Sequence, residues 1–173
     1  MASRSACLEA RRVPRFWLDT NVFITPKNSY YSFDLAPGFW SFIDEQAQTG
    51  EIAAPALVYD ELVDRSDDQL ARWARERRGS PLFVQPSASV QSALTRIADH
   101  VTSRYEPNQA ADFLKGADPW VIAHAIAEGG IVVTLETKVS PRSTKVKIPN
   151  ISEQFGVPWI AMFEMLSELG LRL

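Results

Sequence analysis

The sequence predicts an α/β protein in which helices cover both faces of a central, mostly parallel sheet. Short apolar runs at residues 16–18, 52–54 and 131–135 alternate with longer segments of helical periodicity. The runs lack the period-two pattern of a strand with one exposed face, so we expect both of their faces to be buried. Glycine and proline separate many of these segments, as is typical of alternating strand and helix units.

One domain is expected, preceded by a short leader. The chain has 173 residues, of which 46% are hydrophobic and 23% charged, enough to build one core. Residues 1–14 are polar and basic without an apolar period, so we predict a flexible leader there and a single domain over 15–173. No apolar stretch approaches the roughly 20 residues of a membrane span, and no secretory signal is recognisable.

Cysteine and histidine are scarce, which limits the metal chemistry. Cys7 is the only cysteine, so an intramolecular disulfide and a zinc site of several thiolates are excluded, and a reducing, cytoplasmic location is expected. His100 and His124 have no histidine or cysteine at ligand spacing, so we interpret both as ordinary surface or core residues.

The first half of the chain is predicted to form three strands and three helices. The strand at 16–18 ends at Asp19, and Asn21 and Pro26 then interrupt the pattern. The further elements are expected at 40–47 (helix), 52–54 (strand), 56–74 (helix), 82–84 (strand) and 87–104 (helix, with Ser87 as N-cap).

The second half repeats the alternation. Asp118 and Pro119 open a predicted helix that Gly129 and Gly130 close, and the strand 131–135 follows. After a basic, serine-rich loop to Lys147, we expect a short helix, a strand at 157–160 and a terminal helix striped by Met162, Met165, Leu166 and Leu169.

Four acidic residues fall where parallel strands end or the following helices begin. Asp19 and Glu136 follow strands, Asp118 starts a helix, and Glu61 lies on the helix after the second strand. These positions meet at one edge of an open parallel sheet. Carboxylates gathered there repel one another, and a hard cation such as Mg²⁺ or Mn²⁺, as one or two ions, relieves the repulsion.

Each acid also has a purely structural interpretation. Asp118 before a proline is a good helix N-cap, and Asp19 can form an ordinary turn after a strand. Glu61 can be an exposed helix residue, with Asp60 competing for its role, and Glu136 can be a simple loop acid. The joint pattern is more specific than any single position.

Four segments carry a resemblance to the PIN-domain family. The segments are WLDTNVFI at 17–24, VYDEL at 58–62, GADPWVIA at 116–123 and VVTLE at 132–136. They resemble the acidic motifs of PIN domains, including relatives of the VapC-type toxins, over roughly residues 15–173. At the fourth position Glu136 replaces the more common aspartate, which adds one carbon to the side chain.

The resemblance implies a Rossmann-like, three-layer α/β/α sandwich and a metal-dependent endoribonuclease. It implies that the metal-binding, catalytic acids are Asp19, Glu61, Asp118 and Glu136. It further implies dependence on Mg²⁺ or Mn²⁺, a tendency to form a homodimer, and an antitoxin protein as a partner in a toxin–antitoxin pair.

Polar and basic residues near the acids suggest supporting roles. Thr20, Asn21 and Thr134 are expected to orient the carboxylates or to hold water, with plain turn and strand-end chemistry as the alternative. The basic loop is expected to contact RNA phosphates, although it can equally be a solvated face; its cations are Lys138, Arg142, Lys145 and Lys147.

Aromatic residues and net charge give weaker information. Tyr30 and Tyr31 are candidates for stacking on bases, whereas Trp40 is expected in the core. The net charge of −3 argues against a protein that binds nucleic acid over its whole surface, but it permits a local basic groove. A further basic cluster, at Arg72, Arg75, Arg77 and Arg78, is interpreted as a solvated face or part of such a groove.

The function predicted from these features is hydrolysis of RNA by metal-activated water, without a protein nucleophile. One alternative is a PIN-like module that binds RNA or protein with little catalysis. Another is a phosphatase of the haloacid-dehalogenase type with Asp19 as nucleophile. That class usually has a second aspartate two residues later, where this chain has Asn21.

Overall fold

A computed structural model describes residues 13–65 and 67–172. Its centre is a five-stranded parallel sheet in the order β3-β2-β1-β4-β5. The strands are β1 (Phe16–Leu18), β2 (Ile52–Pro55), β3 (Phe83–Val84), β4 (Ile131–Thr134) and β5 (Trp159–Ala161). The predicted parallel sheet is therefore confirmed. The expected leader falls almost entirely on residues 1–12, and Cys7 with it, outside the described residues.

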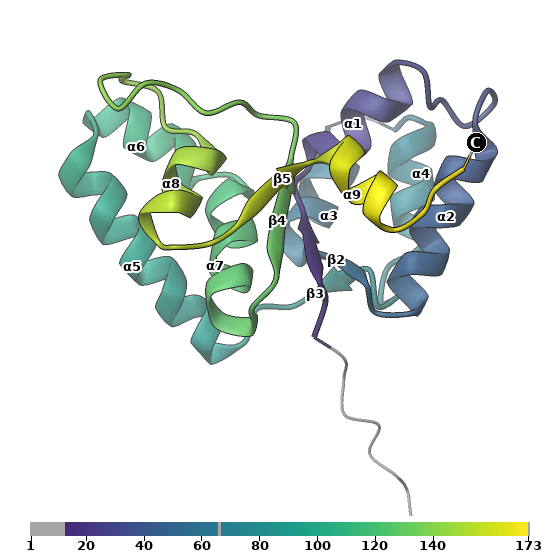
Figure 1. The fold of residues 1–173 in the computed structure, drawn as a ribbon, viewed down its shortest axis with the longest axis horizontal. Helices are drawn as coiled ribbons and strands as arrows, with labels where there is room; N and C mark the ends of the chain where they lie inside the picture. The colour runs from purple at the N-terminus through teal and green to yellow at the C-terminus, as the bar shows by residue number, and fades with distance from the viewer. Residues whose placement is uncertain (1–12, 66, 173) are drawn as a thin grey trace, which may run out of the picture.

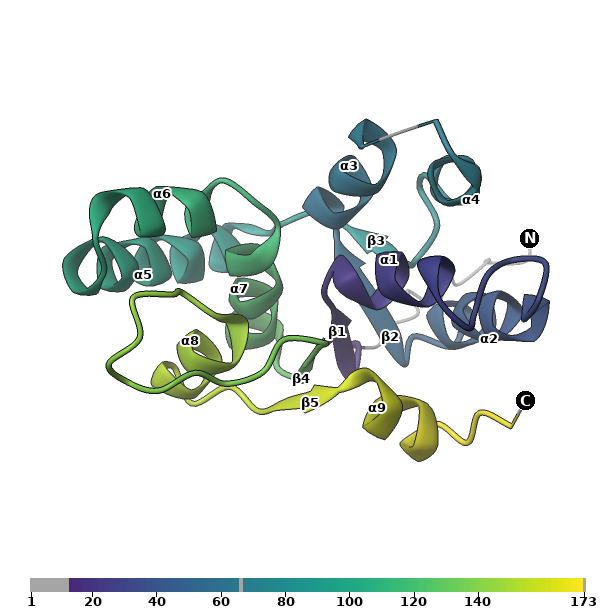
Figure 2. The same cartoon turned by 90° about the horizontal axis from the view of Figure 1, so that it is seen from above.

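Helices lie on both sides of the sheet and make the predicted three-layer sandwich (Figures 1 and 2). One layer holds α5 (Ala88–Arg104), α6 (Pro107–Leu114), α7 (Asp118–Glu128) and α8 (Ile148–Gln154). The other side holds α1 (Asn21–Asn28), α2 (Pro37–Gln48), α4 (Gln69–Glu76) and α9 (Met162–Glu168), with α3 (Ala56–Asp64) following β2 beside α4. Within the described ranges, no helix is both long enough and apolar enough to span a membrane.

The central strands β1 and β2 are buried because each carries apolar residues on both faces. Phe16, Trp17 and Leu18 of β1 are at most 1% exposed, and the four residues of β2 are buried as well. β1 is central and pairs with β2 and β4, so its following residue, Asp19, lies at the middle of the sheet's carboxyl edge. The backbone N–H of Asp19 donates to the carbonyl of Val133 (3.0 Å) and continues this pairing.

Three predicted features differ from the observed elements. Asn21 begins a helix that contains Pro26, where the sequence suggested an interruption. The helix expected over 56–74 is two helices, because Asp68 caps a new one by accepting from the backbone N–H of Ala71 (3.0 Å). Helix α6, which opens with Pro107, was not predicted.

Other expectations about the core are confirmed. Ser87 caps α5 by accepting from the Val90 N–H (3.3 Å). Trp40 is 3% exposed and stacks on Phe33. His124 is fully buried against the Trp17 ring, as one of the two ordinary positions expected for it.

Candidate metal centre

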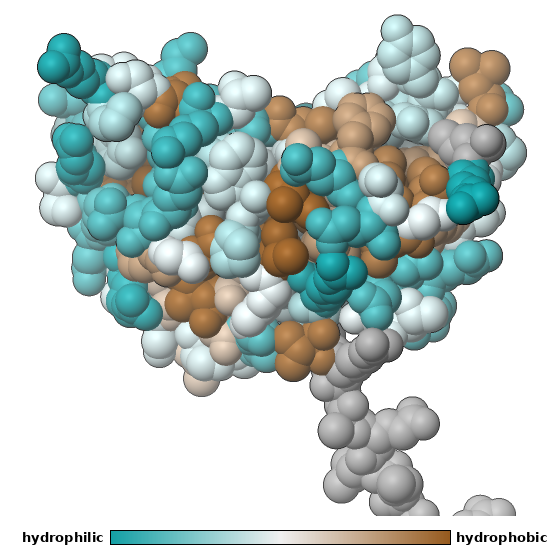
Figure 3. Space-filling view, viewed as in Figure 1, coloured by the Kyte–Doolittle hydropathy of each residue, from teal (hydrophilic) through white to brown (hydrophobic). Residues whose placement is uncertain are grey.

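The four predicted acids follow strands or lie on helices that begin at the carboxyl edge of the sheet. This edge of the central strand β1 faces the top of the view in Figure 1. Asp19 follows β1, Glu61 lies in the second turn of α3, Asp118 is the first residue of α7, and Glu136 stands two residues after β4. In the space-filling view the molecule is hollowed there, between its two helical layers (Figure 3).

Asp19 is the most deeply buried acid. Its side chain is fully buried, and Oδ2 accepts from the Thr134 hydroxyl (3.0 Å). Its Oδ1 has no hydrogen-bond partner among the described residues. Burial, together with the charge of Glu136, raises the pKa of Asp19 to about 6, although the bond from Thr134 opposes that rise. A buried carboxylate oxygen without a donor is suited to a cation.

Asp118 is half-buried, and its pKa is raised more than that of Asp19. Burial, followed by the charges of Asp19, Glu136 and Glu61, raises its pKa to about 8, and only partial relief comes from the Lys147 charge. The three acids whose charges raise the pKa of Asp118 are the other members of the predicted set. The fold therefore brings all four within electrostatic range, from positions spread over more than 100 residues of sequence.

Asp118 is not an N-cap, contrary to its structural interpretation. The N-cap of α7 is Ala117, and no side chain of the described residues caps that end. The backbone N–H of Ala117 instead donates to Oε1 of Glu61 (2.8 Å). Asp118 is thus left with its carboxylate at the first turn of α7, where the helix dipole favours negative charge.

Glu61 is fixed by neutral donors. Its Oε2 accepts from the Thr20 hydroxyl (2.6 Å), and its Oε1 from Ala117. Asp60, the competing acid, is exposed and has no such contacts with the described residues. Gly116 packs closely here, because a Cβ at this position would stand 3.0 Å from Oε1 of Glu61. The structure therefore distinguishes Glu61 from Asp60.

Glu136 has a different environment, since a lysine neutralises it. Lys147 Nζ donates to Oε1 (2.6 Å) and the backbone N–H of Ile148 to Oε2 (2.8 Å). The N–H of Glu136 itself donates to Oγ1 of Thr134 (3.1 Å), the hydroxyl that also contacts Asp19. The sequence predicted that Lys147 contacts RNA phosphates or lies on a solvated face, and it did not indicate this ion pair.

The remaining predicted residues are divided between the site and the surface. Thr20 and Thr134 orient acids by the bonds above, while Asn21 is half-buried at the start of α1. Arg142 and Lys145 are exposed, and Lys138 pairs with Glu153 (2.5 Å). Tyr30 is 87% exposed, whereas Tyr31 is half-buried and stacks on Phe39 of the core.

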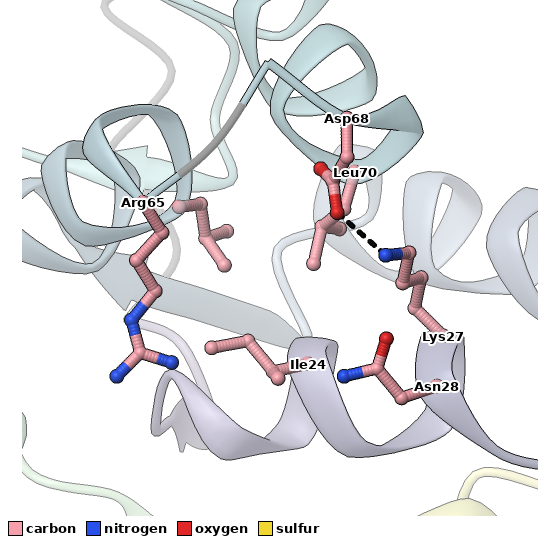
Figure 4. A pocket seen from close by; sticks show the side chains of 7 residues that line it. Ile24, Lys27, Asn28, Arg65, Asp68 and Leu70 are labelled. Atoms are coloured by element: carbon pink, nitrogen blue, oxygen red, sulfur yellow. Dashed lines mark hydrogen bonds and ion pairs between the residues drawn. The ribbon is translucent and has the colours of Figure 1, made fainter.

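Two hollows border the α3 side of the site. One, of about 520 Å³, contains Glu61 and Ala117 in its lining and extends along α3 to Arg65 and Lys115. The second, of about 180 Å³, lies between α1 and the α3–α4 junction, where Lys27 and Asp68 form an ion pair (Figure 4). Arg65 lines both hollows, and in the larger one it shares the lining with Glu61.

The four acids interact electrostatically, but their side chains are not arranged as a set of metal ligands. In the part of the chain that the structure describes, no three or more His, Cys, Asp or Glu side chains are arranged to hold a metal ion. Nevertheless, the donor set fits a hard cation. It is rich in carboxylate oxygen, one buried oxygen of Asp19 has no donor among the described residues, and burial together with mutual repulsion raises the pKa values of Asp19 and Asp118.

Comparison with known proteins assigns the chain to a family. Residues 16–173 match the model of the family described as Domain of unknown function (DUF4411). The chain belongs to this family. No curated protein matches the sequence.

A solved structure shows the same fold. The chain is similar to the crystal structure of VapBC2 from Rickettsia felis bound to a DNA fragment from their promoter. The TM-score is 0.50 at 16% identity, over 84% of this chain and 97% of that chain. At this identity the similarity establishes the fold alone, and it agrees with the three-layer α/β/α sandwich that the sequence predicted.

Proposed function

We propose that this DUF4411 protein is a metal-dependent nuclease that hydrolyses RNA. The observation that supports the proposal is the electrostatic coupling of four acids at the carboxyl edge of the sheet, with Asp118 most strongly affected. The PIN-like, VapC-related fold supports it independently. In this proposal Asp19 and Asp118 bind Mg²⁺ or Mn²⁺ directly, and Glu61 supplies a third carboxylate.

Bound metal would supply an activated water and would stabilise negative charge on the phosphate. The protein's own residues prepare the site for this chemistry. Thr134 holds one oxygen of Asp19 and leaves the other free, and Thr20 with the Ala117 N–H fixes Glu61. Such bonds set the direction of a carboxylate before the ion arrives, which reduces the cost of ordering it.

The test is cleavage of a single-stranded RNA in the presence of Mn²⁺, with DNA of the same sequence as a comparison substrate. Asp19→Asn should reduce the cleavage rate by on the order of 100-fold, the size typical of losing one electrostatic contact to the transition state. Asp99→Asn, at an exposed acid on α5, is the matched control and should retain the wild-type rate. Equal rates in the Asp19 variant and the wild type would contradict the proposal.

A second candidate is a binding module with little catalysis. It is favoured by the lack, in the described ranges, of side chains already arranged around a metal position. Calorimetric titration with Mn²⁺ separates the two candidates. Heat of binding that disappears in Asp19→Asn supports the nuclease, and no binding at millimolar Mn²⁺ supports the module.

The proposed biological setting is a toxin–antitoxin pair. The similar structure is that of VapBC2 bound to promoter DNA, and this chain covers 97% of the matched chain. We therefore propose a small antitoxin protein as a partner and a homodimer as the assembly. Co-expression with the neighbouring reading frame, followed by size-exclusion chromatography with light scattering, tests both: a single stoichiometric complex supports them, and separate elution contradicts them.

A further inference from the structure

Lys147 lies among the acids and is held there by Glu136. Its ammonium contacts Oε1 of Glu136 at 2.6 Å, and its charge partly offsets the repulsion that Asp118 experiences. The side chain of Lys147 is 32% exposed, compared with 15% for Glu136. The carboxylate therefore forms the inner side of the ion pair and the ammonium reaches toward solvent.

The attachment of Glu136 is rigid. Ile148 N–H occupies its second oxygen at 2.8 Å, and its own N–H is bonded to the buried Thr134. Lys147 is the N-cap of α8, so its backbone is also ordered by the helix that follows. A lysine held at both backbone and side chain loses little additional conformational entropy when it binds a ligand.

Glu136 also differs from Glu61 in the charge of its partners. Glu61 accepts from a hydroxyl and a backbone N–H, which leave its negative charge uncompensated. Glu136 already has a cation at ion-pair distance. A metal ion at Glu136 would have to compete with that ammonium, whereas a metal ion at Asp19 would meet a free oxygen.

We infer that Glu136 is a positioning residue for Lys147, not a metal ligand, and that Lys147 binds a phosphate of the nucleic-acid strand beside the acids. An ammonium has three N–H donors, and the contact with Glu136 uses one of them. The others can reach phosphate oxygens. A phosphodiester approaching clustered carboxylates is repelled, so a fixed cation next to them gives it a favourable contact. The inference rests on the proposed function for the identity of the ligand.

Lys147 is distinct from the other cations of its loop. Arg142 and Lys145 are exposed, and Lys138 is tied to Glu153 on the outside of α8. Of the four basic residues expected to bind RNA, Lys147 is thus the one that the structure joins to an acid of the site. We expect it to contribute more to binding than its exposed neighbours.

The first experiment measures binding of a single-stranded RNA oligonucleotide in EDTA, so that neither metal nor cleavage contributes. Lys147→Gln should weaken binding about 5- to 10-fold and lower the slope of log K against log salt by about 0.7, the value for one phosphate contact on a single strand. Arg172→Gln, which removes an exposed cation after α9, is the matched control and should leave the slope unchanged. An unchanged slope in Lys147→Gln would overturn the phosphate contact.

The second experiment tests how Glu136 acts. If it works through Lys147, Glu136→Gln weakens RNA binding in the same assay, and the double variant Glu136→Gln/Lys147→Gln is no weaker than Lys147→Gln alone. Losses that add in full would overturn the positioning role. Thermal melts of each variant confirm that the comparison concerns folded protein.

Manganese titration distinguishes a failure of this inference from a failure of the nuclease proposal. Glu136→Gln should keep the wild-type Mn²⁺ affinity within about twofold. Asp19→Asn should lower the Mn²⁺ affinity at least about tenfold, because even residues that only support a metal ligand typically change the affinity by that much. An equal loss in both variants would make Glu136 a metal ligand and overturn the inference. If the wild type binds no Mn²⁺, the nuclease proposal fails, and the metal-free RNA assay still decides the role of Lys147.

Discussion

At the scale of single residues, Thr134 joins two acids of the site. Its buried hydroxyl donates to Asp19 and accepts from the N–H of Glu136. Valine has nearly the same shape but no hydroxyl. Removing one partner of a buried polar group leaves the other without a hydrogen bond, and this is more costly than the mean value of a hydrogen bond suggests.

Thr134→Val should therefore lower the free energy of unfolding by about 1 to 3 kcal/mol, measured by urea denaturation near neutral pH. Thr134→Ser retains the hydroxyl and is the matched control, with a smaller loss from the missing methyl group. If the valine and serine variants unfold at the same urea concentration, the hydroxyl has no stabilising role at this position.

The positions of the acids could be predicted from sequence, but their partners could not. Asp19, Asp118 and Glu136 mark the ends of strands and the start of a helix, and those patterns are local. The bond from Thr20 to Glu61 spans 41 residues, and the bond from Thr134 to Asp19 spans 115. Such pairs depend on how the elements pack, which no local pattern in one sequence records.

At the scale of elements, one error in prediction came from a helix breaker that tertiary packing tolerates, and two came from helix starts that were missed. Pro26 lies in the last turn of the eight-residue helix α1 and is buried with Val22 and Phe23, so packing compensates for its missing N–H. Two other features of the sequence mark the starts of the helices that were missed. Asp68 caps α4, and Pro107 occupies the first turn of α6, where proline is favoured.

The turn from α7 into β4 depends on Gly130. Its φ is +107°, and an added Cβ would stand 2.9 Å from the carbonyl oxygen of Pro14 and 3.0 Å from that of Arg15. Both the backbone conformation and the contact with the chain entering β1 thus exclude a side chain. Neighbouring Gly129 also has a positive φ, +82°, but an added Cβ there would meet open space.

Gly130→Ala should consequently destabilise the protein more than Gly129→Ala. We expect about 1 kcal/mol for Gly129→Ala, from backbone strain alone, and at least about 2 kcal/mol for Gly130→Ala, where steric overlap adds to the strain. Urea unfolding of the two variants and the wild type measures the difference. Equal losses would show that the approach of residues 14 and 15 does not constrain this turn.

At the scale of the whole molecule, folding makes ionisation of the clustered acids less favourable. Burial, with the charges of the neighbouring acids, raises the pKa of Asp118 to about 8 and that of Asp19 to about 6, from ordinary values near 3.8. Between those limits the folded state retains protons that the unfolded state has released. Stability from these groups is therefore greatest below about pH 4 and falls as the pH rises toward 8.

Asp118→Asn should remove much of this dependence. Without metal, its melting temperature should exceed that of the wild type at pH 8, by about 2 to 4 °C for each kcal/mol of repulsion relieved, and the two should converge near pH 4. Asp99→Asn, at an exposed acid, should follow the wild-type curve. Scanning calorimetry in EDTA across this pH range makes the measurement, and parallel curves for Asp118→Asn and the wild type would contradict it.

Mn²⁺ should narrow the difference in melting temperature between the two proteins at pH 8, because a cation relieves the same repulsion only when the carboxylates are present to bind it. Metal at 100 times its dissociation constant stabilises the folded state by about 2.7 kcal/mol. The melting temperature of the wild type should rise accordingly, while that of Asp118→Asn should change little. A similar rise in both proteins would place the bound ion away from Asp118, and the raised pKa would then reflect burial and repulsion without a metal-binding role.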